Sequence, residues 1–170
     1  MRRKKKAATA VAGMRVGKKR SDMRWMDPEG EIWASKFEYG VYAALKSSGV
    51  SVRRCGKSDS LSYQSKVTSG RCQTCSSTDV VTERTYTPDL FVVPHNRDPE
   101  DGYYVEAKGY LRSERRTLLR SFRKTRPTTR LRMVVMRDYP VGKGTLTEWV
   151  TKYLKIPVHI WNGKLPEDWT

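Results

Sequence analysis

Residues 85–94 read TYTPDLFVVP and residues 103–109 read YYVEAKG, and these two segments decide the fold that we expect. Each contains an apolar run of the length of one strand, and the polar residues between them predict a connecting loop. Asp89 leads into the first strand. Glu106 and Lys108 share one face of the second, because alternate residues of a strand point to the same side. The pattern therefore brings three charged side chains to one end of a small sheet.

The two acidic residues of this hairpin suit a metal site. Asp89 and Glu106 adjoin apolar residues, so both would lie at the margin of a core, where like charges repel each other and lose hydration. With the backbone carbonyl of Ala107 they supply the oxygen ligands that Mg²⁺ or Mn²⁺ prefers, and Lys108 beside them can stabilise a phosphate or position the attacking water. This chemistry cuts phosphodiesters. An exposed ion pair between Glu106 and Lys108 is the alternative interpretation.

The charge of the chain indicates a polyanionic partner. Its 170 residues include 34 Lys and Arg against 18 Asp and Glu, which gives a formal net charge of +16 and a pI near 10.0. DNA fits this balance. An acidic membrane surface fits less well, because no apolar run approaches spanning length and no amphipathic basic helix carries a lipid-facing stripe. Residues 7–13 are too short and weakly apolar for the core of a signal peptide. We expect a cytoplasmic protein, in the host cell cytoplasm if the chain is encoded by a phage.

The start of the chain is strongly basic, because residues 1–24 hold ten Lys or Arg and one Asp. Such a segment buries too little apolar surface to offset its ordering entropy, so we expect a disordered basic arm. It could capture phosphate backbones or serve as a solubilising tail. Residues 25–170 are expected to form one domain.

A first helix is predicted by Trp33, Phe37, Val41 and Leu45, which recur at helical spacing. Glu38 lies at the margin of this apolar stripe. It could be a solvated helix residue, as Glu usually is, or it could add a third carboxylate to the metal site. The helical pattern leaves this choice open.

The three cysteines lie between this helix and the hairpin. Cys72 and Cys75 form a CxxC turn, which is typical of half of a zinc knuckle, and Cys55 offers a third thiolate. The fourth ligand of a structural Zn²⁺ would be His95, Asp59, Asp79, water or a partner chain. The alternative is a set of reduced thiols without a metal.

A basic helix is predicted after the hairpin, over residues 113–124, with Ser113 as its cap. Basic residues of this helix and of a later turn are predicted to contact DNA phosphates. They are Arg112, Arg115, Arg116, Arg120 and Arg123 in and next to the helix, and Lys143 in the turn. Residues 131–136 and 156–161 predict two further strands, and Thr145 with Glu148 predicts a capping box for a last helix. No glycine-rich nucleotide loop occurs, so we expect no nucleotide cofactor.

Taken in order, these features resemble a known family. They are the helix with Glu38, YTPD at 86–89, VEAKG at 105–109, the basic helix, an apolar strand, GKG at 142–144 and LPEDW at 165–169. The set is similar to the bacteriophage endonuclease I family of Holliday-junction resolvases, which belongs to the PD-(D/E)xK nuclease superfamily. The similarity spans roughly residues 33–169.

The resemblance implies an α/β, restriction-endonuclease-like core with a small mixed central sheet flanked by helices. It implies that Asp89 and Glu106 bind the catalytic metal ion, that Lys108 is the catalytic lysine and that Glu38 is the helix-borne acid, sharing any second ion. It further implies a hydrolase that acts as an intertwined homodimer on branched DNA during recombination. The cysteine-bearing insertion at about 55–79 lengthens the stretch that bridges the subunits in the family, which leaves the intertwining open.

Two other functions remain compatible with these residues. One is a non-catalytic DNA-binding or packaging protein that keeps the nuclease fold. The other is a nicking, restriction-type or transposon-end nuclease that uses the same carboxylates on linear DNA.

Overall fold

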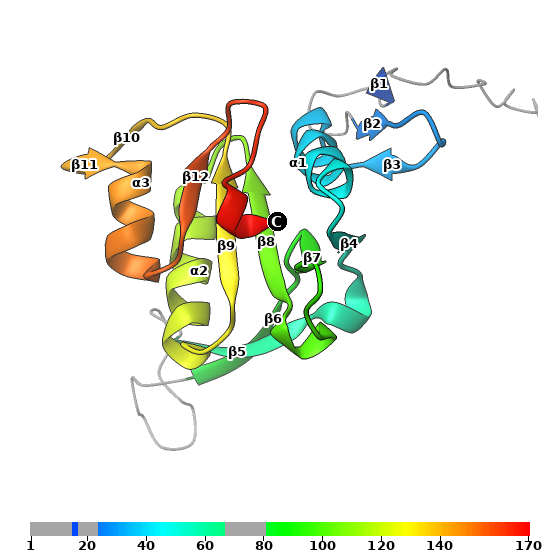
Figure 1. Cartoon of the computed structure of the whole chain (residues 1–170). Coiled ribbons are helices and arrows are strands. Elements are labelled where there is room, and N and C mark those ends of the chain that lie inside the picture. The colour runs from blue at the N-terminus through cyan, green and yellow to red at the C-terminus, as the bar shows by residue number, and fades with distance from the viewer. Residues whose placement is uncertain (1–14, 17–23, 67–80) are drawn as a thin grey trace, which may run out of the picture.

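The computed structural model describes residues 15–16, 24–66 and 81–170. Its centre is a mixed five-stranded sheet in the order β12-β9-β8-β7-β4 (Figure 1). The strands are β4 Ser51–Arg54, β7 Leu90–Val93, β8 Tyr103–Lys108, β9 Leu131–Val135 and β12 Val158–Ile160. Strand β7 pairs antiparallel with both β4 and β8, whereas β9 pairs parallel with both β8 and β12. The expected α/β class with a mixed central sheet is confirmed.

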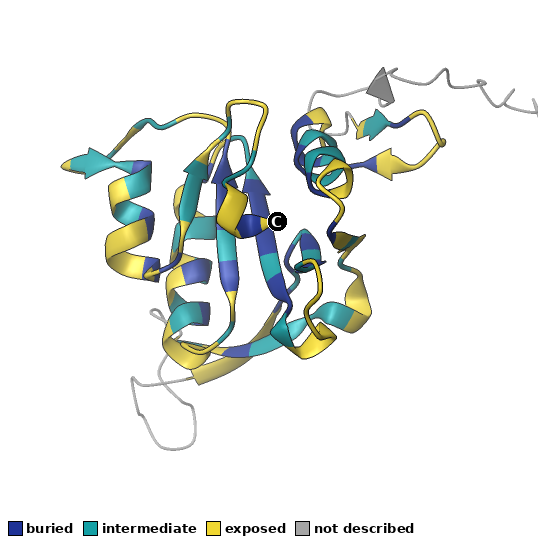
Figure 2. Cartoon of the chain, in the orientation of Figure 1, coloured by how far each residue is buried: buried dark blue, intermediate teal, exposed yellow. Residues whose placement is uncertain are grey.

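Three α-helices of the described residues flank this sheet: α1 Lys36–Ser47, α2 Ser113–Thr125 and α3 Leu146–Trp149, which continues as a π-helix over Val150–Leu154. One apolar cluster joins α1 to the sheet, and a second joins α2 and α3 to it. The most deeply buried segments are β8 and β9, between these two clusters (Figure 2). Residues of β8 therefore alternate between the α1 side and the α2 side.

Helix α1 begins later than its apolar spacing predicts. Ser35 is the N-cap, and its side chain accepts a hydrogen bond from the backbone of Glu38 at 3.1 Å. Trp33 instead belongs to a strand, because its indole nitrogen donates to the buried Asp27 at 2.8 Å and holds a hairpin together. This hairpin is β2 Arg24–Met26 and β3 Ile32–Trp33, and β1 Arg15–Val16 pairs with β2.

A second antiparallel hairpin is formed by β5 Leu61–Lys66 and β6 Val81–Tyr86. It is tied to the end of α2, where Arg126 donates to the carbonyl of Ser62 at 2.6 Å. Apolar and polar residues alternate over part of β5, as is typical of a strand, whereas β6 lacks such alternation. Residues 67–80 join the two strands and lie outside the described residues, and so do Cys72, Cys75 and most of the arm predicted over 1–24.

Two predicted helix caps have different outcomes. Ser113 is the first residue of α2 and not its cap, which is Arg112. The capping box of α3 is confirmed, since Thr145 and Glu148 bond each other's backbone N–H. It follows the small hairpin of β10 Pro140–Val141 and β11 Gly144–Thr145. The described 3₁₀ turns are Lys57–Asp59, Pro99–Asp101 and Glu167–Trp169.

No helix of the described part of the chain is both long and apolar enough to cross a membrane.

Candidate active site

The pairing of β7 with β8 places Asp89 beside Glu106. Their last bridge joins Leu90 to Val105, so continuing the antiparallel register sets Asp89 opposite Glu106. The backbone N–H of Ala107 donates to Oδ2 of Asp89 at 2.8 Å, which holds this carboxylate against the end of β8.

Lys108 joins the two carboxylates. Its Nζ lies 2.8 Å from Oδ2 and 3.1 Å from Oδ1 of Asp89, and 3.2 Å from Oε1 of Glu106. The three residues that strand alternation predicts at one sheet end are therefore in direct contact. The exposed ion pair between Glu106 and Lys108, the alternative interpretation, does not describe this arrangement. The side chain of Glu106 is fully buried, and those of Asp89 and Lys108 are mostly buried.

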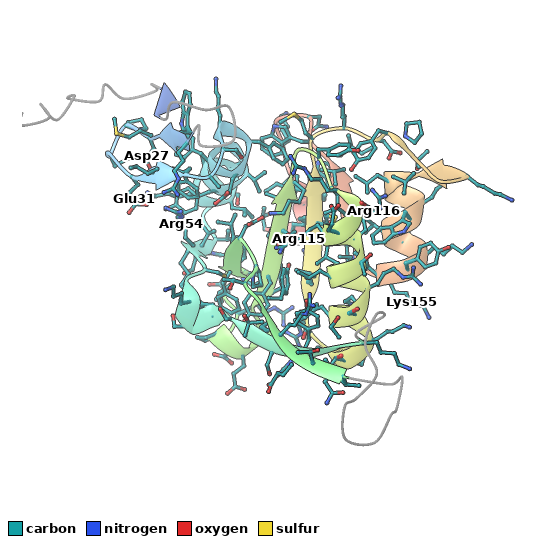
Figure 3. The ribbon with its side chains drawn as sticks, turned by 180° about the vertical axis from the view of Figure 1, so that it is seen from behind. Asp27, Glu31, Arg54, Arg115, Arg116 and Lys155 are labelled. Atoms are coloured by element: carbon teal, nitrogen blue, oxygen red, sulfur yellow. The ribbon has the colours of Figure 1, made fainter. Side chains whose placement is uncertain are left out.

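Glu106 is held by two further donors. The hydroxyl of Tyr86 donates to Oε2 at 2.7 Å. Arg115 of α2 donates to Oε1 from Nη2 at 3.0 Å and from Nε at 3.3 Å, and it points from the helix toward the sheet (Figure 3). Its guanidinium also lies over the Tyr86 ring at 5.1 Å. Both oxygens of the buried carboxylate thus have fixed partners.

The electrostatics of the site disfavour a second negative charge. Burial, and next the charge of Glu106, raise the pKa of Asp89 to about 7, despite the opposing effect of Lys108. Burial alone would lower the pKa of Lys108, but the charges of Glu106 and Asp89 outweigh it and raise that pKa above its usual value. The pKa of Arg115 is raised in the same way by Glu106. The site therefore favours additional positive charge.

Glu38 is buried in the first turn of α1, with 7% of its surface exposed. Burial raises its pKa, and the nearby charges of Lys108 and Arg54 oppose that rise. The side chain is therefore not the solvated helix residue that the sequence left open. It lies close enough to Lys108 and Glu106 for their charges to act on it.

The predicted arginine track divides into two groups. Arg115 binds Glu106, and Arg123 donates to the carbonyls of Leu154 at 2.9 Å and Thr129 at 2.7 Å. Arg116 donates to the carbonyl of Leu111 at 2.8 Å. Arg112, Arg120 and Lys143 are exposed. This last group presents exposed charge of the kind that a phosphate track needs, and the Arg120 guanidinium lies over the Tyr153 ring at 4.7 Å.

Cys55 lies beside the site, because its backbone N–H donates to the carbonyl of Asp89 at 3.0 Å. Burial, followed by the charge of Asp59, raises the pKa of the Cys55 thiol to about 12. Asp59, one predicted zinc ligand, accepts bonds from Arg53 at 2.7 Å and from the backbone of Gly56 at 2.8 Å.

The sequence does not predict the roles of two further residues, Tyr86 and Arg54, which lie near the carboxylates of Glu106 and Glu38. Tyr86 precedes the Pro-Asp pair by two residues, but nothing in the pattern shows that its hydroxyl reaches Glu106. Arg54 ends β4, stacks on Trp33 at 4.4 Å and donates to the carbonyl of Ile32 at 3.0 Å. It lies close enough to Glu38 for its charge to lower the pKa of that carboxyl, which the sequence does not reveal.

The donors at the site fit a hard divalent cation. Within the described ranges, no three His, Cys, Asp or Glu side chains form a group that could hold a metal ion by themselves. Asp89 and Glu106 supply two carboxylates, and the carbonyl of Ala107 faces the same edge as its N–H, as strand geometry requires. Mg²⁺ commonly takes one or two protein carboxylates and completes its shell with water and substrate phosphate.

Comparison with protein-family models, curated proteins and solved structures finds no match to this chain.

Proposed function

We propose that the chain is a metal-dependent endodeoxyribonuclease that resolves branched DNA, such as Holliday junctions, by phosphodiester hydrolysis. The observation that carries this proposal is the bridge that Lys108 Nζ makes between Asp89, at 2.8 Å, and Glu106, at 3.2 Å. Two buried carboxylates and an amine at one sheet end are suited to holding a cation beside a scissile phosphate.

The topology supports membership of the PD-(D/E)xK superfamily and similarity to the endonuclease I family. The chain forms α1, then the antiparallel strands β4, β7 and β8, with the β5–β6 hairpin between β4 and β7, then α2 and the parallel strand β9, giving a mixed sheet flanked by helices. The antiparallel part is the one that carries Asp89 and Glu106. We propose that this is a restriction-endonuclease-like core, with the segment at about 55–79 as an insertion.

In this proposal Asp89, Glu106 and the carbonyl of Ala107 hold Mg²⁺ or Mn²⁺, with Glu38 available to a second ion. When bound, such an ion acts as a Lewis acid and lowers the pKa of a bound water. Lys108 supplies a positive charge for the negative charge that builds up on the phosphate oxygens. Tyr86 and Arg115 keep Glu106 in one orientation, so the cluster does not have to reorganise during the reaction.

Recognition of the substrate rests on shape and phosphate contacts. Arg112, Arg120 and Lys143 are exposed on α2 and the β10–β11 turn, where they can contact the DNA backbone. No module for reading bases is recognisable in the sequence. A homodimer would present two equivalent sites to a junction that offers two equivalent cuts. A structural Zn²⁺ on Cys55, Cys72 and Cys75 remains part of the proposal for the insertion.

The decisive experiment incubates the purified chain with a four-way junction and with a linear duplex of matched sequence, each with Mg²⁺ or with EDTA. We expect Mg²⁺-dependent symmetric cuts confined to the junction. Equal cutting of the linear duplex would instead identify a nicking or restriction-type nuclease. Binding without cleavage would identify a non-catalytic DNA-binding protein.

Two lysine variants locate the chemistry. Lys108→Ala should abolish cleavage and leave junction binding nearly unchanged. Lys124→Ala is the matched control, because Lys124 is exposed near the other end of α2 and lies nine residues from Arg115 along the helix. Cleavage by Lys108→Ala at the rate of the control would reject this active site.

A further inference from the structure

Tyr110 is an exposed aromatic residue immediately beside the proposed active site. It follows Lys108 by two residues, and 63% of its surface is exposed, the largest fraction among the exposed large hydrophobic residues of the described chain. Two residues of extended chain span at most about 7 Å, so its backbone cannot lie far from the catalytic lysine. Stacked bases of one strand are about 3.4 Å apart, so this is a reach of about two nucleotides.

The ring of Tyr110 is held in place from one face. It stacks on Tyr139, with ring centroids 4.9 Å apart and planes inclined by 26°. Tyr139 is itself fixed, because its hydroxyl accepts from the backbone N–H of Leu111 at 2.7 Å and donates to the carbonyl of the same residue at 3.2 Å. Tyr110 therefore presents a flat aromatic face whose orientation is set before any ligand arrives.

The surroundings of this ring are basic and partly apolar. Arg112 and Arg137 are exposed on the two segments that carry the tyrosines, and Lys143 is exposed in the turn that follows Tyr139. Met136, 47% exposed, donates its backbone N–H to the carbonyl of Lys108 at 3.2 Å, so it lies at the same end of the sheet. An aromatic face near exposed, positively charged side chains complements a nucleobase attached to a phosphate backbone.

We infer that Tyr110 is a stacking platform for an unpaired base of DNA, one or two nucleotides from the phosphate that is cut. A paired base inside a continuous duplex has both faces covered by its neighbours, whereas a base at a branch point can unstack. The ring thus favours DNA with a branch, fork or bulge over an intact duplex. This inference deepens the proposed function, because it takes DNA as the partner of the same site.

The test measures binding in EDTA, where no metal-dependent cleavage interferes. Three probes are used: a linear duplex, the same duplex with one bulged 2-aminopurine, and a four-way junction with 2-aminopurine at the branch. For the unmodified chain we expect the fluorescence of 2-aminopurine to be quenched on binding. Tyr110→Ala should weaken binding to the bulged duplex about 5- to 150-fold and remove the quenching, because one base–aromatic stack is worth about 1–3 kcal/mol. Its affinity for the linear duplex should stay within about twofold.

Two further variants separate stacking from other effects. Tyr110→Trp should retain both the preference and the quenching, since it keeps the aromatic face. Tyr153→Ala removes another exposed tyrosine, on the π-helix, and should leave the preference for unpaired bases unchanged. Equal loss of affinity for all three probes in Tyr110→Ala, or no loss for any, would overturn the inference.

The outcome is independent of whether the chain cuts DNA. Binding of the bulged probe that depends on Tyr110, without any cleavage in Mg²⁺, would support the platform and refute the nuclease. Junction cleavage with full preference in Tyr110→Ala would support the nuclease and refute the platform.

Discussion

Tyr86 donates its hydroxyl to Oε2 of Glu106 at 2.7 Å, and both side chains are buried. Tyr86→Phe leaves this oxygen without its donor. An unsatisfied buried acceptor costs about 1–3 kcal/mol, and a charged one lies toward the upper end, so we expect the free energy of unfolding to fall by about 2 kcal/mol in urea titrations. Cleavage should fall as well, because Glu106 loses part of its orientation.

A double-mutant cycle tests whether the hydrogen bond is the cause. Glu106→Gln removes the charge that Tyr86 serves, so Tyr86→Phe should cost less in that background, with a coupling energy above about 0.5 kcal/mol. Additive effects of the two substitutions would contradict the importance of this contact.

The raised pKa of Asp89 predicts a pH dependence of stability. With a pKa of about 7 in the folded chain and an ordinary value of 3.8, the folded state holds more protons than the unfolded state between these pH values. Unfolding then releases a proton, so in EDTA the free energy of unfolding should fall as pH rises from about 4 to about 7. Asp89→Asn lacks this titration, and its melting temperature relative to the unmodified chain should therefore increase with pH over that range.

Mg²⁺ supplies the matching control for this prediction. A cation held by the ionised carboxylates favours the deprotonated folded state, so added Mg²⁺ should reduce the pH dependence of the unmodified chain and leave Asp89→Asn nearly unaffected. A melting difference that is flat from pH 5 to pH 8 without metal would contradict the raised pKa.

Local patterns were sufficient for the strands that carry the site. The segments containing Asp89 and Glu106 have short apolar runs, and strand alternation placed Glu106 and Lys108 on one face, as the structure shows. The apolar run at 131–136 predicts the later strand β9 for the same reason. These features depend on residues close together in the sequence.

Features that depend on distant contacts could not be predicted in this way. Strand β6 is almost entirely exposed and lacks alternation, so only its pairing with β5 makes it a strand. Trp33 fits the helical spacing, yet its bond to Asp27 places it in β3. Arg115 and Arg123 look alike on a basic helix, and only the fold shows that one serves a buried carboxylate and the other backbone carbonyls.

Arg123 and Arg120 should therefore respond differently to truncation. Arg123→Ala removes donors from the carbonyls of Leu154 and Thr129, and we expect a loss of about 1–3 kcal/mol in the free energy of unfolding. Arg120 is exposed and lies over the Tyr153 ring at 4.7 Å, so Arg120→Ala should change stability by less than about 0.5 kcal/mol.

For DNA binding, we expect substitution of Arg120 to have a larger effect than substitution of Arg123. Arg120→Ala should reduce the slope of log affinity against log salt concentration by about 1, as expected for one lost phosphate contact. Arg123→Lys keeps the charge but not the geometry, so it should destabilise the fold while keeping the salt slope. A normal salt slope in Arg120→Ala would remove this residue from the proposed phosphate track.

The thiol of Cys55 should react slowly with alkylating reagents at neutral pH. Burial raises its pKa to about 12, and the thiolate is the reactive form, so little of it exists at neutral pH. With Cys72 and Cys75 replaced by serine, the alkylation rate of Cys55 in the folded chain should keep rising about tenfold per pH unit beyond pH 9, whereas in urea it should level off near the ordinary thiol pKa of about 8.5. Mass spectrometry at timed intervals measures both rates.

The same measurement on the chain with all three cysteines tests the zinc proposal. A thiolate bound to Zn²⁺ is protected, so if Cys55 is a ligand, removing the metal with a chelator should expose it to alkylation. Protection that is unchanged by chelation would leave burial beside Asp89 as the cause, because the backbone of Cys55 is already bonded to the Asp89 carbonyl at 3.0 Å. Zinc content well below one equivalent per chain, with Cys55 still protected, would exclude Cys55 from a zinc site.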